Sequence, residues 1–138
     1  MDAPLSGHIY FDPELYDGHY FIVGPDDPIN SNNVIAFCCT SQNHGRPQIH
    51  GCHSDFRLPS FHLGTGSARA ISRPTWVQLD SVYYYNKADF DGKWKYAKEK
   101  LQLNLTIELL LCAARSTAIS IADAKACQDQ AEAIRGVR

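Results

Sequence analysis

Residues 33–42 read Asn-Val-Ile-Ala-Phe-Cys-Cys-Thr-Ser-Gln, an apolar run that ends abruptly in small polar side chains. The run from Val34 to Cys39 would be apolar on both faces of an extended chain, is too short for a helix and is bounded by Asn- and Gly-containing stretches. This pattern predicts a buried central strand. Thr40 and Ser41 follow where backbone pairing ends. Their hydroxyl groups either bond to the next turn, as Ser and Thr often do, or remain available for binding.

The composition predicts one domain with its own hydrophobic core. The chain has 138 residues, of which 44% are hydrophobic, with 7 Tyr, 6 Phe and 2 Trp, and a chain of this size buries enough surface to fold without staples. No apolar run approaches the roughly 20 residues that a membrane span needs. The first residues lack the basic and then apolar pattern of a signal peptide. We therefore expect a cytoplasmic protein that does not associate with membranes.

Cysteine and histidine usage leaves two interpretations open. The chain has 5 cysteines without a repeated spacing, and in a reducing compartment we expect these to be small core residues rather than disulfides. A metal-dependent enzyme is an alternative, because His50-Gly-Cys52-His53 places three possible ligands close together. However, adjacent ligands on a strand point in opposite directions and no pair of Cys-x-x-Cys units is present. We therefore predict no metal and no cofactor.

The charge distribution favours a local rather than a global attraction for polyanions. The net charge is −2, but residues 1–60 carry −5 and residues 61–100 carry +3. The basic segment also contains aromatic residues interleaved with its charged ones, namely Tyr83, Tyr84, Tyr85, Trp94 and Tyr96. Such a segment either follows a phosphate chain and stacks bases, or forms an ordinary solvated face.

The hydrophobic pattern predicts several short strands followed by helices. Residues 75–85 alternate, so that Trp76, Gln78, Asp80 and Val82 share one face unless the strand breaks at Asp80. The polar loop at residues 42–60 is long enough to be functional or disordered. Further strands are expected at residues 7–11, 19–23, 34–40, 48–50, 60–63 and 93–96. A Leu-rich helix is expected at residues 103–113, and an Ala-rich pattern at 119–134 predicts a terminal helix, a partner-binding tail or a frayed end. These patterns suggest a domain at residues 1–116 and a helical extension at 117–138.

Three stretches, in this order, resemble the MazF/PemK (Kid-like) ribonuclease toxins. Residues 17–25, Asp-Gly-His-Tyr-Phe-Ile-Val-Gly-Pro, are similar to the family's Gly-His-Arg-Pro strand that runs into Ser-Pro. Residues 34–47, with Cys-Thr-Ser-Gln, resemble the strand that ends in Thr-Thr-Gln or Thr-Ser. Residues 77–80, Val-Gln-Leu-Asp, resemble the strand that ends in a Val-x-x-Asp-Gln type motif.

The resemblance implies a fold, an activity and partners. The fold would be mainly β (α+β), a small SH3-like twisted antiparallel barrel with a C-terminal Leu-rich helix. Such proteins dimerise, pair with an antitoxin protein and cleave single-stranded RNA without a metal. A base takes the proton of the ribose 2′-OH, whose oxygen attacks the adjacent phosphorus, and donors stabilise the phosphoryl charge. By this resemblance Asp80 is the base or its orienter, and Thr40 and Ser41 bind the scissile phosphate.

Two arginines of the family pattern are replaced here by Tyr20 and Gln78. We expect His19 or Arg73 to supply an acid or a positive charge instead, with Arg46 or Arg57 contributing from the long loop. His19 and Arg73 are then expected to converge in one cleft with Asp80, Thr40 and Ser41. The residues expected to bind substrate are Gln42, Gln78, Arg46 and Arg57. The alternative function is a catalytically degenerate SH3-like module that binds RNA or a protein partner.

Overall fold

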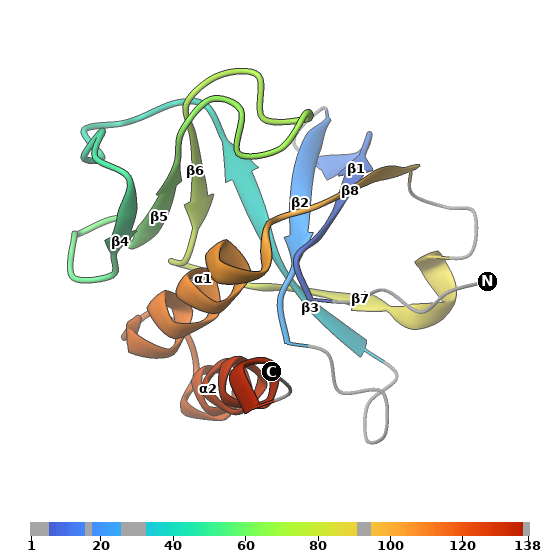
Figure 1. Cartoon of the computed structure of the whole chain (residues 1–138), viewed down its shortest axis with the longest axis vertical. Coiled ribbons are helices and arrows are strands. Elements are labelled where there is room, and N and C mark those ends of the chain that lie inside the picture. The colour runs from blue at the N-terminus through green and yellow to red at the C-terminus, as the bar shows by residue number, and fades with distance from the viewer. Residues whose placement is uncertain (1–5, 16–17, 26–32, 91–94, 137–138) are drawn as a thin grey trace.

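The computed structural model describes residues 6–15, 18–25, 33–90 and 95–136, which form a curled antiparallel sheet and two helices (Figure 1). The expected turn at 26–32, Asp17, and Lys93 and Trp94 of the expected last strand lie outside these residues. The elements are β1 (His8–Asp12), β2 (His19–Val23), β3 (Asn33–Thr40), β4 (Gly51–His53), β5 (Ser60–Leu63), β6 (Thr75–Gln78), β7 (Tyr83–Asn86), a 3-10 helix (Lys87–Phe90), β8 (Lys95–Lys100), α1 (Leu103–Arg115) and α2 (Ile121–Gly136).

Strand β3 is the centre of the sheet, as its apolar sequence predicts. The strand order is β4-β5-β6-β3-β2-β1-β8, and β7 also pairs with β3. One edge of β3 pairs with β2, with Phe21 opposite Cys38. The other edge pairs with β7 along its first half and with β6 at its end, where Thr40 lies opposite Trp76. A strand flanked on both edges and covered on both faces has to be apolar along its length, which explains its pattern.

Strands β6 and β7 follow the same edge of β3 but are not continuous. Val77 pairs with Cys39, whereas Tyr83 pairs with Ala36, so residues 79–82 leave the ladder between them. The break at Asp80 is therefore confirmed, and the single alternating face through Asp80 and Val82 is wrong. Extra residues between two paired segments re-aim the side chains that they carry.

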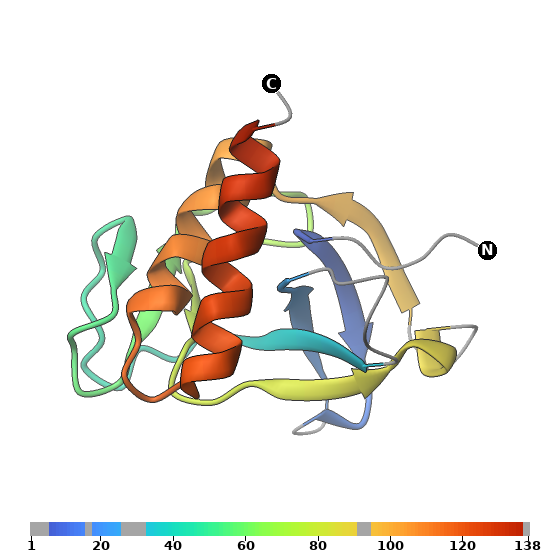
Figure 2. The ribbon, with the colours of Figure 1, turned by 90° about the horizontal axis from the view of Figure 1, so that it is seen from below.

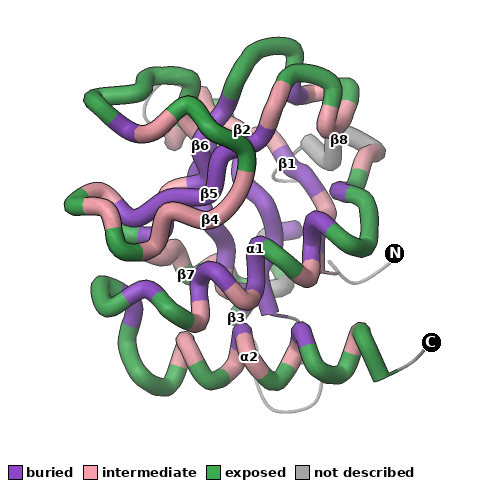
Figure 3. The backbone as a smooth tube through the Cα atoms, turned by 60° about the vertical axis from the view of Figure 1, so that its left-hand side comes forward, coloured by how far each residue is buried: buried purple, intermediate pink, exposed green. Residues whose placement is uncertain are grey.

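Two apolar clusters lie on the two faces of the sheet. Between β1, β2, β3 and β7 lies an aromatic cluster that includes Tyr10, Phe21 and Phe90. The rings of Tyr10 and Phe21 are stacked with centroids 5.6 Å apart. The other face carries the larger core, to which both helices contribute, and buried backbone dominates the centre of the sheet (Figure 3).

The two helices pack side by side against the larger core (Figure 2). Helix α1 buries Leu109, Leu110 and Cys112, while α2 buries Cys127 and Ala131. The apolar stripe of α1 is thus covered within the chain and does not itself require a second subunit. At the start of β1, Gly7 has a φ of +88°, and a Cβ there would lie 2.5 Å from the Thr106 hydroxyl oxygen, so α1 approaches closer than any larger residue would allow.

The predicted fold class is confirmed, with changes in detail. The molecule is a mixed α+β protein, mainly β, whose curled antiparallel sheet forms a half-barrel with two C-terminal helices. The strand expected at 48–50 lies instead at Gly51–His53, because the pairing of His53 with Ser60 sets its register. No helix in the part of the chain that the structure describes is long and apolar enough to span a membrane.

The cysteines correct another expectation. Cys38, Cys39 and Cys127 are free and buried, as core thiols should be. Cys52 and Cys112, however, form a disulfide that links β4 to α1 across 60 residues of sequence. Sequence spacing could not reveal this pair, because α1 is brought to β4 only by the packing of the helix on the sheet.

Replacing Leu110 by Asp should destabilise the fold by about 4 kcal/mol or more, because it places a charge in the larger core. Leu110 is 1% exposed. Leu103, on the same helix, is 55% exposed, and Leu103→Asp is the matched control. Urea unfolding followed by circular dichroism measures both variants. Equal midpoints for the two variants would contradict the placement of α1.

The thiol content provides a second test of the fold. Burial raises the pKa of Cys38 to about 11 and that of Cys127 to about 12, so both thiols should resist alkylation in the folded protein. Iodoacetamide should then label three cysteines in denaturant and five after reduction, as counted by mass spectrometry. Five labels without reductant would show that Cys52 and Cys112 are not bonded.

Candidate functional site: a polar pocket at the end of β3

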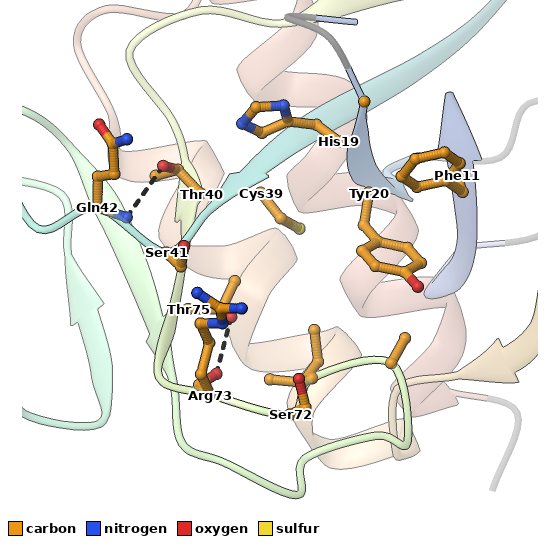
Figure 4. Close-up of a pocket in the computed structure, with 13 residues that line it drawn as sticks. Phe11, His19, Tyr20, Cys39, Thr40, Ser41, Gln42, Ser72, Arg73 and Thr75 are labelled. Carbon is orange, nitrogen blue, oxygen red and sulfur yellow. Dashed lines mark hydrogen bonds between the residues drawn. The ribbon is translucent and has the colours of Figure 1, made fainter. Parts of the chain in front are cut away.

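A pocket of about 370 Å³ opens where β3 ends (Figure 4). Thr40, Ser41 and Gln42 line one side of it, His19 of β2 lies across from them, and Arg73 enters from the loop before β6. We call it the strand-end pocket. Its volume is within the range of small-molecule sites, about 300–1,000 Å³. The remaining lining residues are Phe11, Gly18, Tyr20, Cys39, Ala70, Ile71, Ser72 and Thr75.

The hydroxyl of Thr40 both terminates the strand and faces the pocket. Its Oγ1 accepts a hydrogen bond of 3.2 Å from the backbone N–H of Gln42. This is the local turn that Ser and Thr commonly form after a strand. The Gln42 side chain is 2.9 Å from His44 Nε2, so it also has a local partner. Ser41 is exposed at the pocket's edge.

The imidazole of His19 has a defined tautomer. Its Nδ1 lies 3.1 Å from the Leu15 carbonyl oxygen. A carbonyl can only accept a hydrogen bond, so Nδ1 carries the proton and the neutral ring has its lone pair on Nε2. An imidazole held in this way can accept a proton through Nε2.

The loop that carries Arg73 is held on the protein by several contacts. Glu99 of β8 accepts a hydrogen bond of 2.6 Å from the backbone N–H of Ala70, and Ile71 is 2% exposed in the larger core. At the end of the loop, the Thr75 hydroxyl donates to the Arg73 carbonyl oxygen at 2.9 Å. The Arg73 side chain itself is exposed, and its guanidinium points toward the strand end of Ser41 (Figure 4).

Asp80 lies elsewhere. It lines a second pocket of about 510 Å³ together with Asp55, Arg57 and Arg115. Thr40 pairs with Trp76, whereas Asp80 follows the end of β6 at Gln78 and lies in the segment that leaves the ladder. Thr40 and Asp80 line different pockets. Asp80 therefore does not line the strand-end pocket beside Thr40 and Ser41, because the break at 79–82 takes it out of the ladder with β3.

The two arginines of the long loop both bind its backbone, and only Arg57 lines a pocket with Asp80. Arg46 is 5% exposed, and its Nη1 donates to the Gln42 carbonyl oxygen at 3.1 Å. Burial lowers the pKa of Arg46, while the Asp80 carboxylate acts to raise it. The Arg57 guanidinium donates to the His44 carbonyl oxygen at 3.1 Å and lies over the Phe56 ring. Both arginines thus support the loop with hydrogen bonds to its backbone.

The residues predicted from the sequence to form one site do not all line the same pocket. The strand-end pocket brings together His19, Thr40, Ser41, Gln42 and Arg73. Arg57 and Asp80 belong to the second pocket. Gln78 is half-buried opposite Ser60 and lines neither pocket.

Sequence reasoning missed the aromatic side of the strand-end pocket. Phe11 and Tyr20 face each other across β1 and β2, with ring centroids 5.2 Å apart. The sequence did contain a signal for this side of the pocket. Successive side chains of a strand point to opposite faces, so with Tyr10 and Phe21 on one face, Phe11 and Tyr20 have to share the other.

The histidines near the long loop do not form a metal site. Cys52 is bonded to Cys112, and no group of three His, Cys, Asp or Glu side chains among the described residues is placed to hold a metal ion. His62 is 6% exposed, and neither of its ring nitrogens has a hydrogen-bond partner among the residues that the structure describes. Burial lowers the pKa of His62, and the nearby His50 and His53 lower it further.

A comparison of the chain with protein-family models, with curated proteins and with solved structures finds no match.

The buried His62 predicts that the protein loses stability in mild acid. Its pKa is lowered in the folded state from a value of about 6.5 in the unfolded chain. The free energy of unfolding should then be fully maintained above about pH 6.5 and fall as the pH drops below it, because only the unfolded chain readily takes the proton. His62→Phe should weaken this pH dependence, whereas His44→Gln, at an exposed position, should not. Thermal midpoints between pH 7.5 and 5.5 measure the effect, and parallel curves for wild type and His62→Phe would contradict it.

Proposed function

We propose that this chain binds single-stranded RNA in the strand-end pocket and cleaves it there as a metal-independent, toxin-like endoribonuclease. The observation that carries the proposal is the set of side chains that share this pocket: an imidazole, a guanidinium and two hydroxyls from three separate segments. Acid–base cleavage of a phosphodiester requires groups of these kinds. Core packing gives no reason for them to meet at the end of a buried strand.

In the proposed reaction the neutral His19 accepts the proton of the ribose 2′-OH through Nε2. The 2′-oxygen forms a bond to the adjacent phosphorus, the bond from phosphorus to the 5′-oxygen breaks, and the 5′-oxygen takes a proton from water. The hydroxide left behind takes the proton from His19, which returns the imidazole to its neutral form. Arg73, Thr40 and Ser41 hydrogen-bond the phosphoryl oxygens, whose charge rises during the attack. The products are a 2′,3′-cyclic phosphate and a 5′-hydroxyl end.

The resemblance to the MazF/PemK toxins instead makes Asp80 the base or its orienter. Asp80 lines a different pocket from Thr40, which favours His19 as the base, and the two assignments predict different mutant phenotypes. If Asp80 contributes, it does so from the second pocket, together with Arg57 and Arg115.

A binding module without catalysis is the second candidate. In its favour, the described residues that line the strand-end pocket include no carboxylate. Such a module would hold RNA or a protein partner through the same donors and release it uncut.

The partners and compartment that we propose follow from this activity. They are single-stranded RNA, an antitoxin protein that blocks the pocket, and a second copy of the chain, with the cytoplasm as the compartment of the RNA. The Cys52–Cys112 bond is a counter-indication, because structural disulfides are typical of oxidising compartments. In the cytoplasm this pair is expected to be reduced.

Cleavage of a labelled single-stranded RNA in EDTA tests the proposal. His19→Ala and Arg73→Ala should each lower the rate on the order of 100-fold, the usual contribution of an acid–base or charge-stabilising group. Arg69→Ala is the matched control, since Arg69 is on the same loop but its side chain is 98% exposed and faces Glu99. Asp80→Ala should retain activity. Mass spectrometry of the products should detect the cyclic phosphate.

Three results would decide between the alternatives. Activity lost in Asp80→Ala but kept in His19→Ala would return the base to Asp80. Intact RNA that binds to wild type, with binding weakened by Arg73→Ala, would favour the binding module. RNA that is neither bound nor cut would overturn both candidates.

A further inference from the structure

The strand-end pocket has an aromatic side as well as a polar one. Phe11 of β1 and Tyr20 of β2 lie across the pocket from Thr40 and Ser41 (Figure 4). Both rings are half-buried, unlike Tyr10 and Phe21 on the other face of the same two strands, which are 5% and 0% exposed. Tyr10 and Phe21 are thus enclosed in the core, whereas Phe11 and Tyr20 reach the pocket.

The geometry of the Phe11–Tyr20 pair keeps ring surface available. Their planes cross at 66°, an edge-to-face arrangement, so each ring keeps at least one face that the other ring does not cover. Phe11 is fixed from behind by Gly18, which has a φ of +109° and whose Cβ, if present, would lie 2.9 Å from the tip of the Phe11 ring. A packed Phe11 in turn limits the positions that the Tyr20 ring can adopt.

From this arrangement we infer that Tyr20 is a stacking platform for one unpaired nucleobase whose phosphate is held by Arg73, Thr40 and Ser41. The inference rests on the proposed function and names the part of the RNA that the aromatic side recognises. Single-strand binding sites combine cationic and hydroxyl donors for the backbone with aromatic rings for the bases. This pocket has both sides within about 370 Å³. Stacking tolerates any base, so the subsite selects unpaired nucleotides rather than a particular sequence.

The tyrosine at position 20, where the toxin family's pattern has arginine, is consistent with this role. The resemblance to the toxin family leads one to expect arginine there, and tyrosine replaces a positive charge by a flat ring. Among the described residues that line the pocket, Arg73 then supplies the guanidinium, from the side opposite Tyr20. Base recognition and phosphate recognition are therefore divided between two elements, β2 and the loop before β6.

Two fluorescent probes separate stacking from phosphate binding: a short oligodeoxynucleotide, which has no 2′-OH to react, and its fully abasic counterpart with the same number of phosphates. Wild type should bind the intact probe about tenfold more tightly than the abasic probe, as expected for one stacked base. Tyr20→Leu should lose about tenfold for the intact probe and nothing for the abasic one, whereas Tyr20→Phe should keep its affinity within about twofold. Tyr84→Leu, at a 58% exposed tyrosine outside the pocket, is the matched control and should leave both affinities unchanged.

Equal binding of the two probes by wild type, or a loss in Tyr20→Leu that is the same for both, would overturn the stacking role. If Arg73→Ala still weakens both probes in that case, the RNA site stands and only the base subsite is wrong. A wild type that binds neither probe overturns the RNA site and the stacking role together. Thermal midpoints of the variants check folding, and the comparison of probes on wild type needs no variant.

Discussion

The hydrogen-bond ladder on both edges of β3 is the constraint on which the other features depend. One edge pairs with β2, and the other is shared by β6 and β7. Because every backbone group of a buried strand needs a partner, β3 ends where its neighbours no longer pair with it. It ends at Thr40, beside the first residues of the antiparallel neighbours β2 and β6, His19 and Thr75. The polar groups that follow the strand are therefore gathered at this point, and the strand-end pocket is a direct result of the pairing.

The shared edge also explains why Thr40 and Asp80 line different pockets. β6 and β7 are out of register with each other along β3, and the residues between them project Asp80 away from Thr40. Arg46 lies between the two regions. It donates to the backbone of Gln42 beside the first pocket and is electrostatically coupled to Asp80 beside the second. A change at Arg46 should accordingly affect both pockets.

The long loop covers polar groups that are costly to bury. Four buried polar atoms have no partner in the described part of the chain: Nε of Arg46, Oγ of Ser60 and both ring nitrogens of His62. Unsatisfied buried polar atoms each cost about 1–3 kcal/mol, more when charged. The indole N–H of Trp76 donates to the Pro47 carbonyl oxygen at 2.9 Å, which holds the loop over this face. The Cys52–Cys112 bond connects the adjacent hairpin to α1. These two connections offset part of that cost.

Local hydrophobic patterns were enough to predict the strands and helices that have a clear periodicity. The apolar run before Thr40 predicted a central strand, and the helical spacing of Leu103, Ile107 and Leu110 predicted a helix, because both patterns follow from local periodicity. The sequence also identified five residues that the strand-end pocket brings together. Only the tertiary structure decided the location of Asp80, the Cys52–Cys112 pair and the contribution of Phe11 and Tyr20. Each of these depends on register between segments distant in sequence: a shift of a few residues between β6 and β7 moves a carboxylate by several ångströms, and no local pattern encodes that shift.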